Sequence, residues 1–247
     1  GINRYLVYGQ ICVVNPAKIG TKAAAHYRLI ISAGKCETVR LRLTPVAPAA
    51  LDKTYGKGSG SFGKHFDEVL QARRREADEF YAGVIPRSLD ADAANVMRQA
   101  LAGMLWSKQF FFYDVNRWLE ERGSDPYVPS AKQSPRNAQW HHMYNADIIS
   151  MPDKWEYPWY AAWDLAFHVT ALTLVDADFG KEQLELLLKS RYLHPSGQIP
   201  AYEWNFGDVN PPVHAWSTIY TYLLEKAQRG EGDLAWLERS FHKLLLN

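Results

Sequence analysis

The chain lacks the features that define several large protein classes. Its 247 residues include only two cysteines, Cys12 and Cys36, which make no disulfide framework and favour buried thiols in a reduced compartment. No apolar run is long enough to cross a bilayer, and 28 basic and 27 acidic residues leave a net charge of +1. We therefore expect neither membrane nor nucleic acid as a partner. The first residues also carry no signal peptide, which predicts a cytoplasmic location.

Common motifs for metals, phosphates and nucleophiles are missing too. The eight histidines follow neither HExxH nor Cys/His spacing, so the sequence predicts no metal site. The glycine-rich run at residues 56–61 lacks the order of a phosphate-binding loop and is interpreted as a linker. No GxSxG element marks a serine nucleophile. We expect no cofactor.

The first 65 residues predict a partial N-terminal β region followed by a linker. Residues 38–43 alternate strictly between apolar and polar side chains, which is typical of a strand with one buried face. Residues 5–7, 11–14 and 27–31 are further strand candidates. Four short strands make a poor sheet alone, so we expect an incomplete β-sandwich. The strand-like start without an initiator methionine predicts that the chain begins inside a domain.

Residues 66–247 have a helical pattern, so the predicted fold is mainly α. We expect helices at 66–81, 158–175 and 181–192, and a long helix capped by Asp90 or Asp92 that continues past Phe111 and Phe112. Further helices follow Asn210 and Asp233, and residues 122–153 are predicted as a long loop. Paired helices with aromatic and carboxylate residues at their junctions are typical of an (α/α) toroid. We expect residues 66–247 to form the N-terminal half of such a toroid, an incomplete six-hairpin barrel.

Tryptophans and carboxylates gather in two nearby segments. Residues 154–164 (KWEYPWYAAWD) and 198–205 (QIPAYEWN) together contain four tryptophans and three carboxylates. Sugar C–H faces stack on aromatic rings, and sugar hydroxyls need charged or bidentate hydrogen-bond partners. Asp164 is thus either a sugar-binding carboxylate or a structural residue bonded to a loop amide or arginine. The second segment is either a ligand-binding edge or an aromatic loop packed over the helices.

These and other segments resemble one family. The two aromatic segments, with HPSGQIPAYEW (194–204), DVNPPVHAW (208–216), NPAKIGTKAAAHY (15–27) and MRQALAGMLWSKQ (97–109), are similar to bacterial glucosidase-like proteins of glycoside hydrolase family 63. The resemblance implies a β-domain before a six-hairpin α/α toroid. It also implies inverting hydrolysis of an α-glycoside by one acidic and one basic carboxyl group.

The resemblance further implies the roles of single residues. Trp163 and Asp164 resemble the Trp-Asp pair that holds the non-reducing sugar, which is not the general acid. Both catalytic carboxyl groups would then lie beyond Asn247. The expected substrate-binding residues are Glu156, Tyr160, Trp163, Asp164, Tyr202, Glu203, Trp204 and Asn205.

Three hypotheses follow from these observations. The first is a fragment of a family 63-like α-glycosidase that carries part of the sugar cavity. The second is an autonomous small glycosidase that uses Asp164 and Glu203 as its catalytic pair. The third is a non-catalytic carbohydrate-binding module whose open toroid face is covered in a homo-oligomer.

Overall fold

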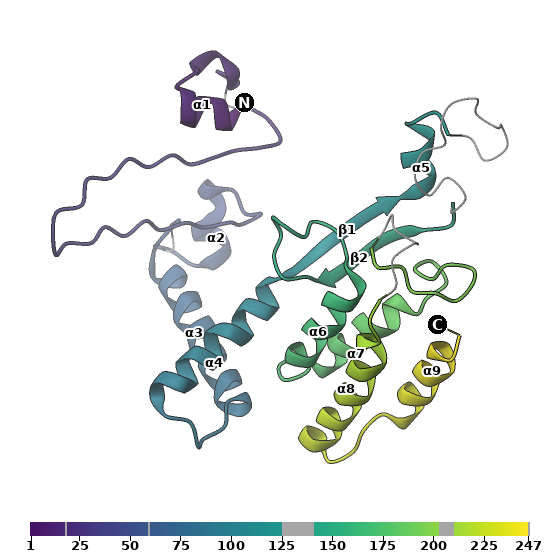
Figure 1. Ribbon diagram of the computed structural model, residues 1–247. Coiled ribbons are helices and arrows are strands. Elements are labelled where there is room, and N and C mark those ends of the chain that lie inside the picture. Colours follow the sequence, from purple (N-terminus) through teal and green to yellow (C-terminus); the bar gives the residue numbers. More distant parts are fainter. Residues whose placement is uncertain (18, 59, 125–140, 203–209, 247) are drawn as a thin grey trace. The chain divides into compact units, whose positions relative to one another are not determined.

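The structure is a computed structural model that describes the whole chain except residues 18, 59, 125–140, 203–209 and 247. It confirms a mainly α fold, with a small two-stranded sheet among the described residues (Figure 1). The chain divides into two units, Gly1–Arg73 and Arg74–Asn247, each described by itself below. The division lies within α3 (Lys64–Val84), past the boundary expected at residue 65. No helix in the described ranges is both long and apolar enough to span a bilayer.

The first unit contains short helices and long extended segments. Its elements are α1 (Ile2–Tyr8), η1 (Ile11–Val13), η2 (Pro48–Ala50), α2 (Leu51–Tyr55) and the start of α3. Gly9 ends α1 with a φ of 65°, a conformation that glycine adopts without strain. Leu51 alone is buried among the residues described in this unit. A unit with so small a core gains little free energy from apolar burial.

The strands predicted for this unit are not formed. Residues 5–7 lie in α1, and residues 11–13 form η1. Residues 27–31 and 38–43 have no backbone ladder with another described segment. Leu43 is fully exposed, and Arg40 instead forms an ion pair with Asp67 at 3.2 Å. Alternation identifies the face that a strand would bury, but a sheet forms only where a second strand supplies the backbone partners.

In the second unit, the later part of α3 associates with α4 (Ala91–Trp106). The predicted cap is confirmed, because the Asp90 carboxylate accepts a hydrogen bond from the Ala93 N–H at 2.8 Å. The Arg98 guanidinium lies 2.7 Å from the Asp78 carboxylate and 5.0 Å from the centroid of the Tyr81 ring. These contacts place α3 and α4 next to each other.

An antiparallel pair of strands follows α4. β1 (Lys108–Asp114) pairs with β2 (Tyr144–Ser150), with Phe111 opposite Asp147. Phe111 is buried whereas Phe110 and Phe112 are exposed, as expected for alternating faces of a strand. The prediction of a helix through residue 115 was therefore wrong, as was a loop covering all of 122–153. The aromatic run at 110–113 favours a strand once β2 provides its partner.

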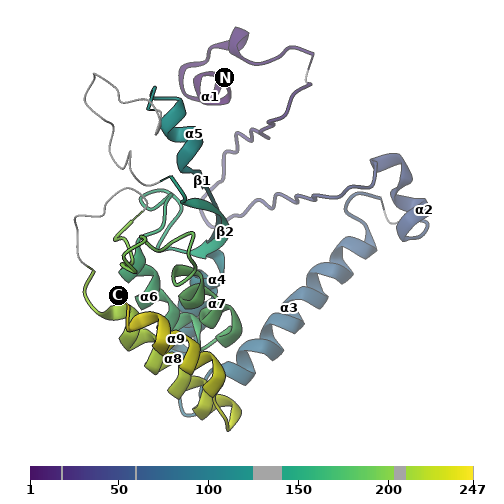
Figure 2. The same ribbon diagram turned by 90° about the vertical axis from the view of Figure 1, so that its right-hand side faces the viewer.

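The described part of this unit contains five further helices. α5 (Val115–Glu120) follows β1, and α6 (Ala162–Leu172), α7 (Ala177–Leu187), α8 (Val213–Arg229) and α9 (Leu234–Leu244) form the main helical layer. α6 contacts both α7 and α8, and α8 contacts α9, as Figures 1 and 2 show. Leu165, Val169, Leu184 and Leu187 are fully buried between them. The core of the described structure thus centres on α6.

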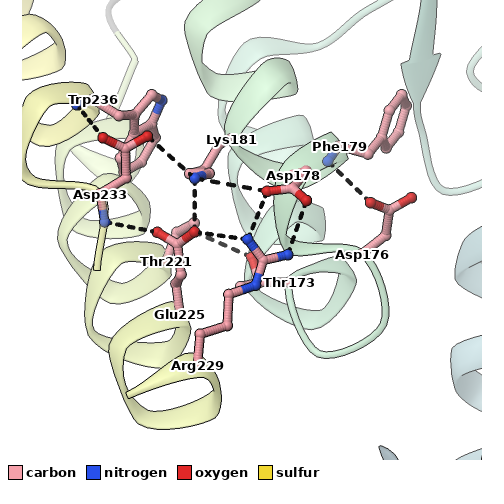
Figure 3. Close-up of polar contacts among 10 residues, drawn as sticks. All are labelled: Thr173, Asp176, Asp178, Phe179, Lys181, Thr221, Glu225, Arg229, Asp233 and Trp236. Carbon is pink, nitrogen blue, oxygen red and sulfur yellow. Dashed lines mark hydrogen bonds and ion pairs between the residues drawn. The ribbon is translucent and has the colours of Figure 1, made fainter. Parts of the chain in front are cut away.

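A buried carboxylate connects α7, α8 and α9. The Glu225 side chain is only 4% exposed and accepts hydrogen bonds from Lys181 Nζ at 2.7 Å and Arg229 Nη1 at 3.0 Å (Figure 3). It also accepts the Asp233 backbone N–H at 3.1 Å. Asp178 holds the other side of the Arg229 guanidinium through two hydrogen bonds, at 2.7 and 2.9 Å. We call Lys181, Glu225, Arg229, Asp178 and Asp233 the ionic cluster.

Candidate functional site

The structure brings the two aromatic segments together at the start of α6. Ala161 forms an isolated antiparallel bridge with Tyr202. The next residue, Ala162, donates its backbone N–H to the Ala201 carbonyl at 2.8 Å. Segments about forty residues apart in the sequence therefore share one edge, as expected if they form one site.

Trp163 and Asp164 lie in the first turn of α6. The Trp163 side chain is 41% exposed, so part of its ring faces solvent. Partial burial raises the pKa of the Asp164 carboxyl, although its backbone hydrogen bond and the nearby His168 favour the charged form. The N-terminal end of a helix also favours a negative charge. Asp164 is thus a partly desolvated carboxylate that follows Trp163, an accessible aromatic residue, in the sequence of α6.

His168 stands one turn after Asp164 and lies deeper. Burial lowers its pKa, and the charge of Asp164 opposes that effect. The Ser150 hydroxyl lies 3.4 Å from His168 Nδ1, and Ser150 is fully buried. Because a nucleophile must reach its substrate, this Ser-His-Asp grouping does not have the geometry of an acyl-transfer triad.

A cavity of about 400 Å³ opens next to Trp163. Its walls come from the N-terminal ends of α6 and α8, the 198–199 segment and the end of α9. Asn210 donates its side-chain N–H to the Ile199 carbonyl at 2.6 Å, while its buried Oδ1 has no partner among the described residues. Gln198 adds a second amide to the lining. A concave surface with an aromatic edge and a few amides is a common form of small-molecule site.

His214 forms the cavity wall from α8 and is neutral. Its Nε2–H donates to the Leu184 carbonyl at 2.9 Å, and burial lowers its pKa to about 4. His214 and Asn210 were not predicted from the sequence as lining residues. A helix was expected to follow Asn210 directly, but the N-cap of α8 is Pro212, without a side-chain hydrogen bond. The Asn-Pro pair does indicate where α8 begins; the hydrogen bond of Asn210 to Ile199 depends on tertiary contact.

The other predicted site residues occupy different environments. Tyr160 is fully buried and packs edge-on against Phe111 and Tyr192, at ring-centroid distances of 6.0 and 5.3 Å. The structure thus gives Tyr160 a place in the core. Glu156 is exposed on a turn in which the Asp153 carboxylate accepts its N–H at 2.6 Å. Tyr202 is half-buried at the bridge to Ala161.

Three of the predicted site residues, Glu203, Trp204 and Asn205, lie outside the described residues. The separation of Asp164 and Glu203 is therefore not described either. Within the described ranges, no group of three or more His, Cys, Asp or Glu side chains has the arrangement of a metal site. The site that the structure describes therefore consists of the cavity, Trp163 in its lining, and Asp164 as the next residue of α6.

Exposed aromatic rings continue from Trp163 along α6 and α8. Trp163 contacts Phe167, Phe167 contacts Trp216, and Trp216 stacks on Tyr220, at centroid distances of 5.9, 6.0 and 5.3 Å. All four side chains are between 41% and 50% exposed. This aromatic row extends the apolar surface at the cavity mouth.

The fold and site together define a mainly α protein with a small cavity that has an aromatic rim. The chain is 43% identical over 245 residues to the uncharacterized protein YMR196W of Saccharomyces cerevisiae. The matched region is 98% of this chain and 22% of the yeast protein, so the chain spans about a fifth of that relative's length. No protein-family model matches the chain. No solved structure matches it either.

Proposed function

We propose that this chain supplies part of the carbohydrate-binding cavity of an inverting α-glycoside hydrolase resembling family 63. One observation carries the proposal: a partly exposed Trp163 lines a cavity of about 400 Å³ near the point where the two aromatic segments meet, and the partly desolvated Asp164 follows it in the first turn of α6. The ring offers a face for sugar C–H groups, and the carboxylate can accept two hydroxyl hydrogen bonds.

In this proposal Asp164 positions the sugar and does not transfer a proton. Partial burial raises the pKa of Asp164, whereas the first turn of α6 and the nearby His168 favour the charged form, which accepts hydrogen bonds from sugar hydroxyls. The resemblance of Trp163-Asp164 to a sugar-holding pair agrees with that role. The catalytic acid and base would then come from other parts of a longer protein.

The proposed architecture is part of an α/α toroid. Consecutive helices α6, α7, α8 and α9 contact one another in an order compatible with two neighbouring hairpins. The first turns of α6 and α8 both reach the cavity, as the inner helices of a toroid would. A complete toroid would require helices beyond those described.

Sugar binding can be measured on the Trp163 indole by protein-observed NMR. The indole N–H signal, assigned through Trp163→Phe, should shift as methyl α-glucoside or maltose is added. Loss of a charge-assisted hydrogen bond costs about 1.5–3 kcal/mol, so Asp164→Asn should weaken binding about tenfold or more. Trp155→Phe is the matched control, because Trp155 is 91% exposed and lies outside the cavity lining. An unshifted Trp163 signal at high sugar concentration would contradict the proposal.

The bridge between Ala161 and Tyr202 favours a second candidate function. Glu203 directly follows Tyr202 in the sequence, so Asp164 and Glu203 could form the catalytic pair of an autonomous glycosidase. Inverting carboxyl groups lie about 6.5–9.5 Å apart. Hydrolysis of aryl α-glycosides by the chain alone, abolished by both Asp164→Asn and Glu203→Gln, would favour this candidate. Sugar binding without any turnover, in a homo-oligomer, would favour a non-catalytic module.

A further inference from the structure

A second concave surface lies away from the sugar cavity. A groove of about 800 Å³ runs between the C-terminal end of α7 and one face of α9. The charged side chains in its lining are Lys189, Arg191, Arg239, Lys243 and Glu185. Four permanent cations therefore face one carboxylate, in a chain whose charges otherwise nearly cancel. The groove shares no lining residue with the sugar cavity.

The positive charge of this groove is only partly neutralised within the described structure. Lys189 and Lys243 form no ion pair with a described residue, and Arg239 Nε lies 3.9 Å from Glu185 Oε1, beyond hydrogen-bond distance. Arg191 donates to the Asp147 carboxylate through Nη2. Its Nε is buried and has no hydrogen-bond partner in the described residues.

We propose that the groove binds a small phosphorylated organic ligand. Arginine offers a planar fork that matches phosphate oxygens, and lysine adds a mobile point charge. Arg239 and Lys243 are four residues apart on α9, so they lie one turn apart on the same face. Leu188 and Leu246 give apolar wall for the organic part. The volume lies within the usual range of about 300–1,000 Å³ for small-molecule sites.

The observations favour a small ligand over a nucleic acid. Binding to a nucleic acid depends on a basic surface that follows many phosphates. Here the cations are gathered in one concavity, and the net charge of the chain is +1. A DNA duplex is the alternative ligand, and its binding is compared with that of the small ligand below.

The test is isothermal titration calorimetry of the purified protein with glucose 6-phosphate at fixed ionic strength, with glucose and inorganic phosphate titrated separately. We expect glucose 6-phosphate to bind more tightly than either. Arg239→Gln and Lys243→Gln should each weaken its binding about tenfold, because each removes a charged hydrogen-bond donor. Lys226→Gln, on the exposed face of α8 and outside the groove, should change it less than about twofold.

Three results would overturn the proposal. One is no heat of binding with glucose 6-phosphate at millimolar concentration. Another is that glucose or inorganic phosphate binds as tightly as glucose 6-phosphate, or that the Lys243→Gln variant binds glucose 6-phosphate as tightly as the wild type. The third is that a DNA duplex binds with the same dependence on Arg239 and Lys243 while glucose 6-phosphate does not. Because both substituted side chains are exposed, melting temperatures near that of the wild type should show that the variants are folded.

Discussion

Replacing Glu225 by glutamine should destabilise the protein through loss of one buried charge. The substitution keeps the shape of the side chain but leaves Lys181 and Arg229 facing a neutral amide. Removal of one partner from a buried ion pair costs about 3–5 kcal/mol. Two features of the ionic cluster reduce that cost. Arg229 is 45% exposed and keeps its two hydrogen bonds to Asp178, and Lys181 keeps Asp233 at 3.4 Å.

We therefore expect Glu225→Gln to lower the free energy of unfolding by about 2–3 kcal/mol. The glutamine oxygen can still accept one of the three donors, so a complete loss is not expected. Urea denaturation followed by far-ultraviolet circular dichroism measures the difference, because a change in midpoint at constant slope reports stability.

The matched control is Asp178→Asn in the same cluster. The Asp178 side chain is 66% exposed, so its ion pair with Arg229 is screened by water and should contribute less than about 1 kcal/mol. If Glu225→Gln and Asp178→Asn shift the midpoint equally, burial of Glu225 does not determine its contribution.

Two further predictions concern His214 and Asp90. Burial lowers the folded pKa of His214 to about 4 from an unfolded value near 6.5, so the unfolded state binds the extra proton first. The neutral His214 therefore contributes at most about 3 kcal/mol to the free energy of unfolding. This contribution is present above pH 6.5 and is lost as the pH falls toward 4. As the pH falls from 7 to 4, the urea midpoint should decrease less steeply in His214→Gln than in the wild type. The same pH dependence in both proteins would contradict the lowered pKa of His214. Asp90→Ala removes the cap of α4 and should cost about 1 kcal/mol by the same urea assay, whereas Asp92→Ala, outside the capping bond, should cost less. Equal losses for the two aspartates would argue against the cap.

Local signals in the sequence predicted much of the helical part. Asp90 and Asp233 each accept a hydrogen bond from a backbone N–H three residues later, an interaction within one turn that the sequence displays directly. The β1 strand was missed because its partner lies at least thirty residues away along the chain, and aromatic residues at 110–113 also fit a helix face. The strands predicted before residue 45 failed for the converse reason, since the strand-like alternation there finds no partner strand among the described residues.

The candidate site was predictable only in part. The aromatic and carboxylate composition of residues 154–164 and 198–205 identified two segments, and the Ala161–Tyr202 bridge joins them. Which side chains face the cavity depends on packing. Trp163 is accessible, whereas Tyr160, three residues earlier, is fully buried against Phe111 and Tyr192. Asn210 and His214 reach the cavity because α8 begins beside α6, a tertiary contact that no local pattern encodes.

The rigidity of α6 connects the stability of the chain to its proposed site. Leu165, Ala166, Val169 and Leu172 on this helix are all fully buried, so α6 presents Trp163 and Asp164 from a fixed element. The ionic cluster acts at the opposite end of α8 from the cavity, since Glu225 and Arg229 lie in its last turns and His214 in its first. Glu225→Gln should therefore lower stability without changing sugar binding in the folded protein, and Asp164→Asn should do the reverse. Loss of sugar binding in a folded Glu225→Gln variant would show instead that the position of α8 controls the cavity.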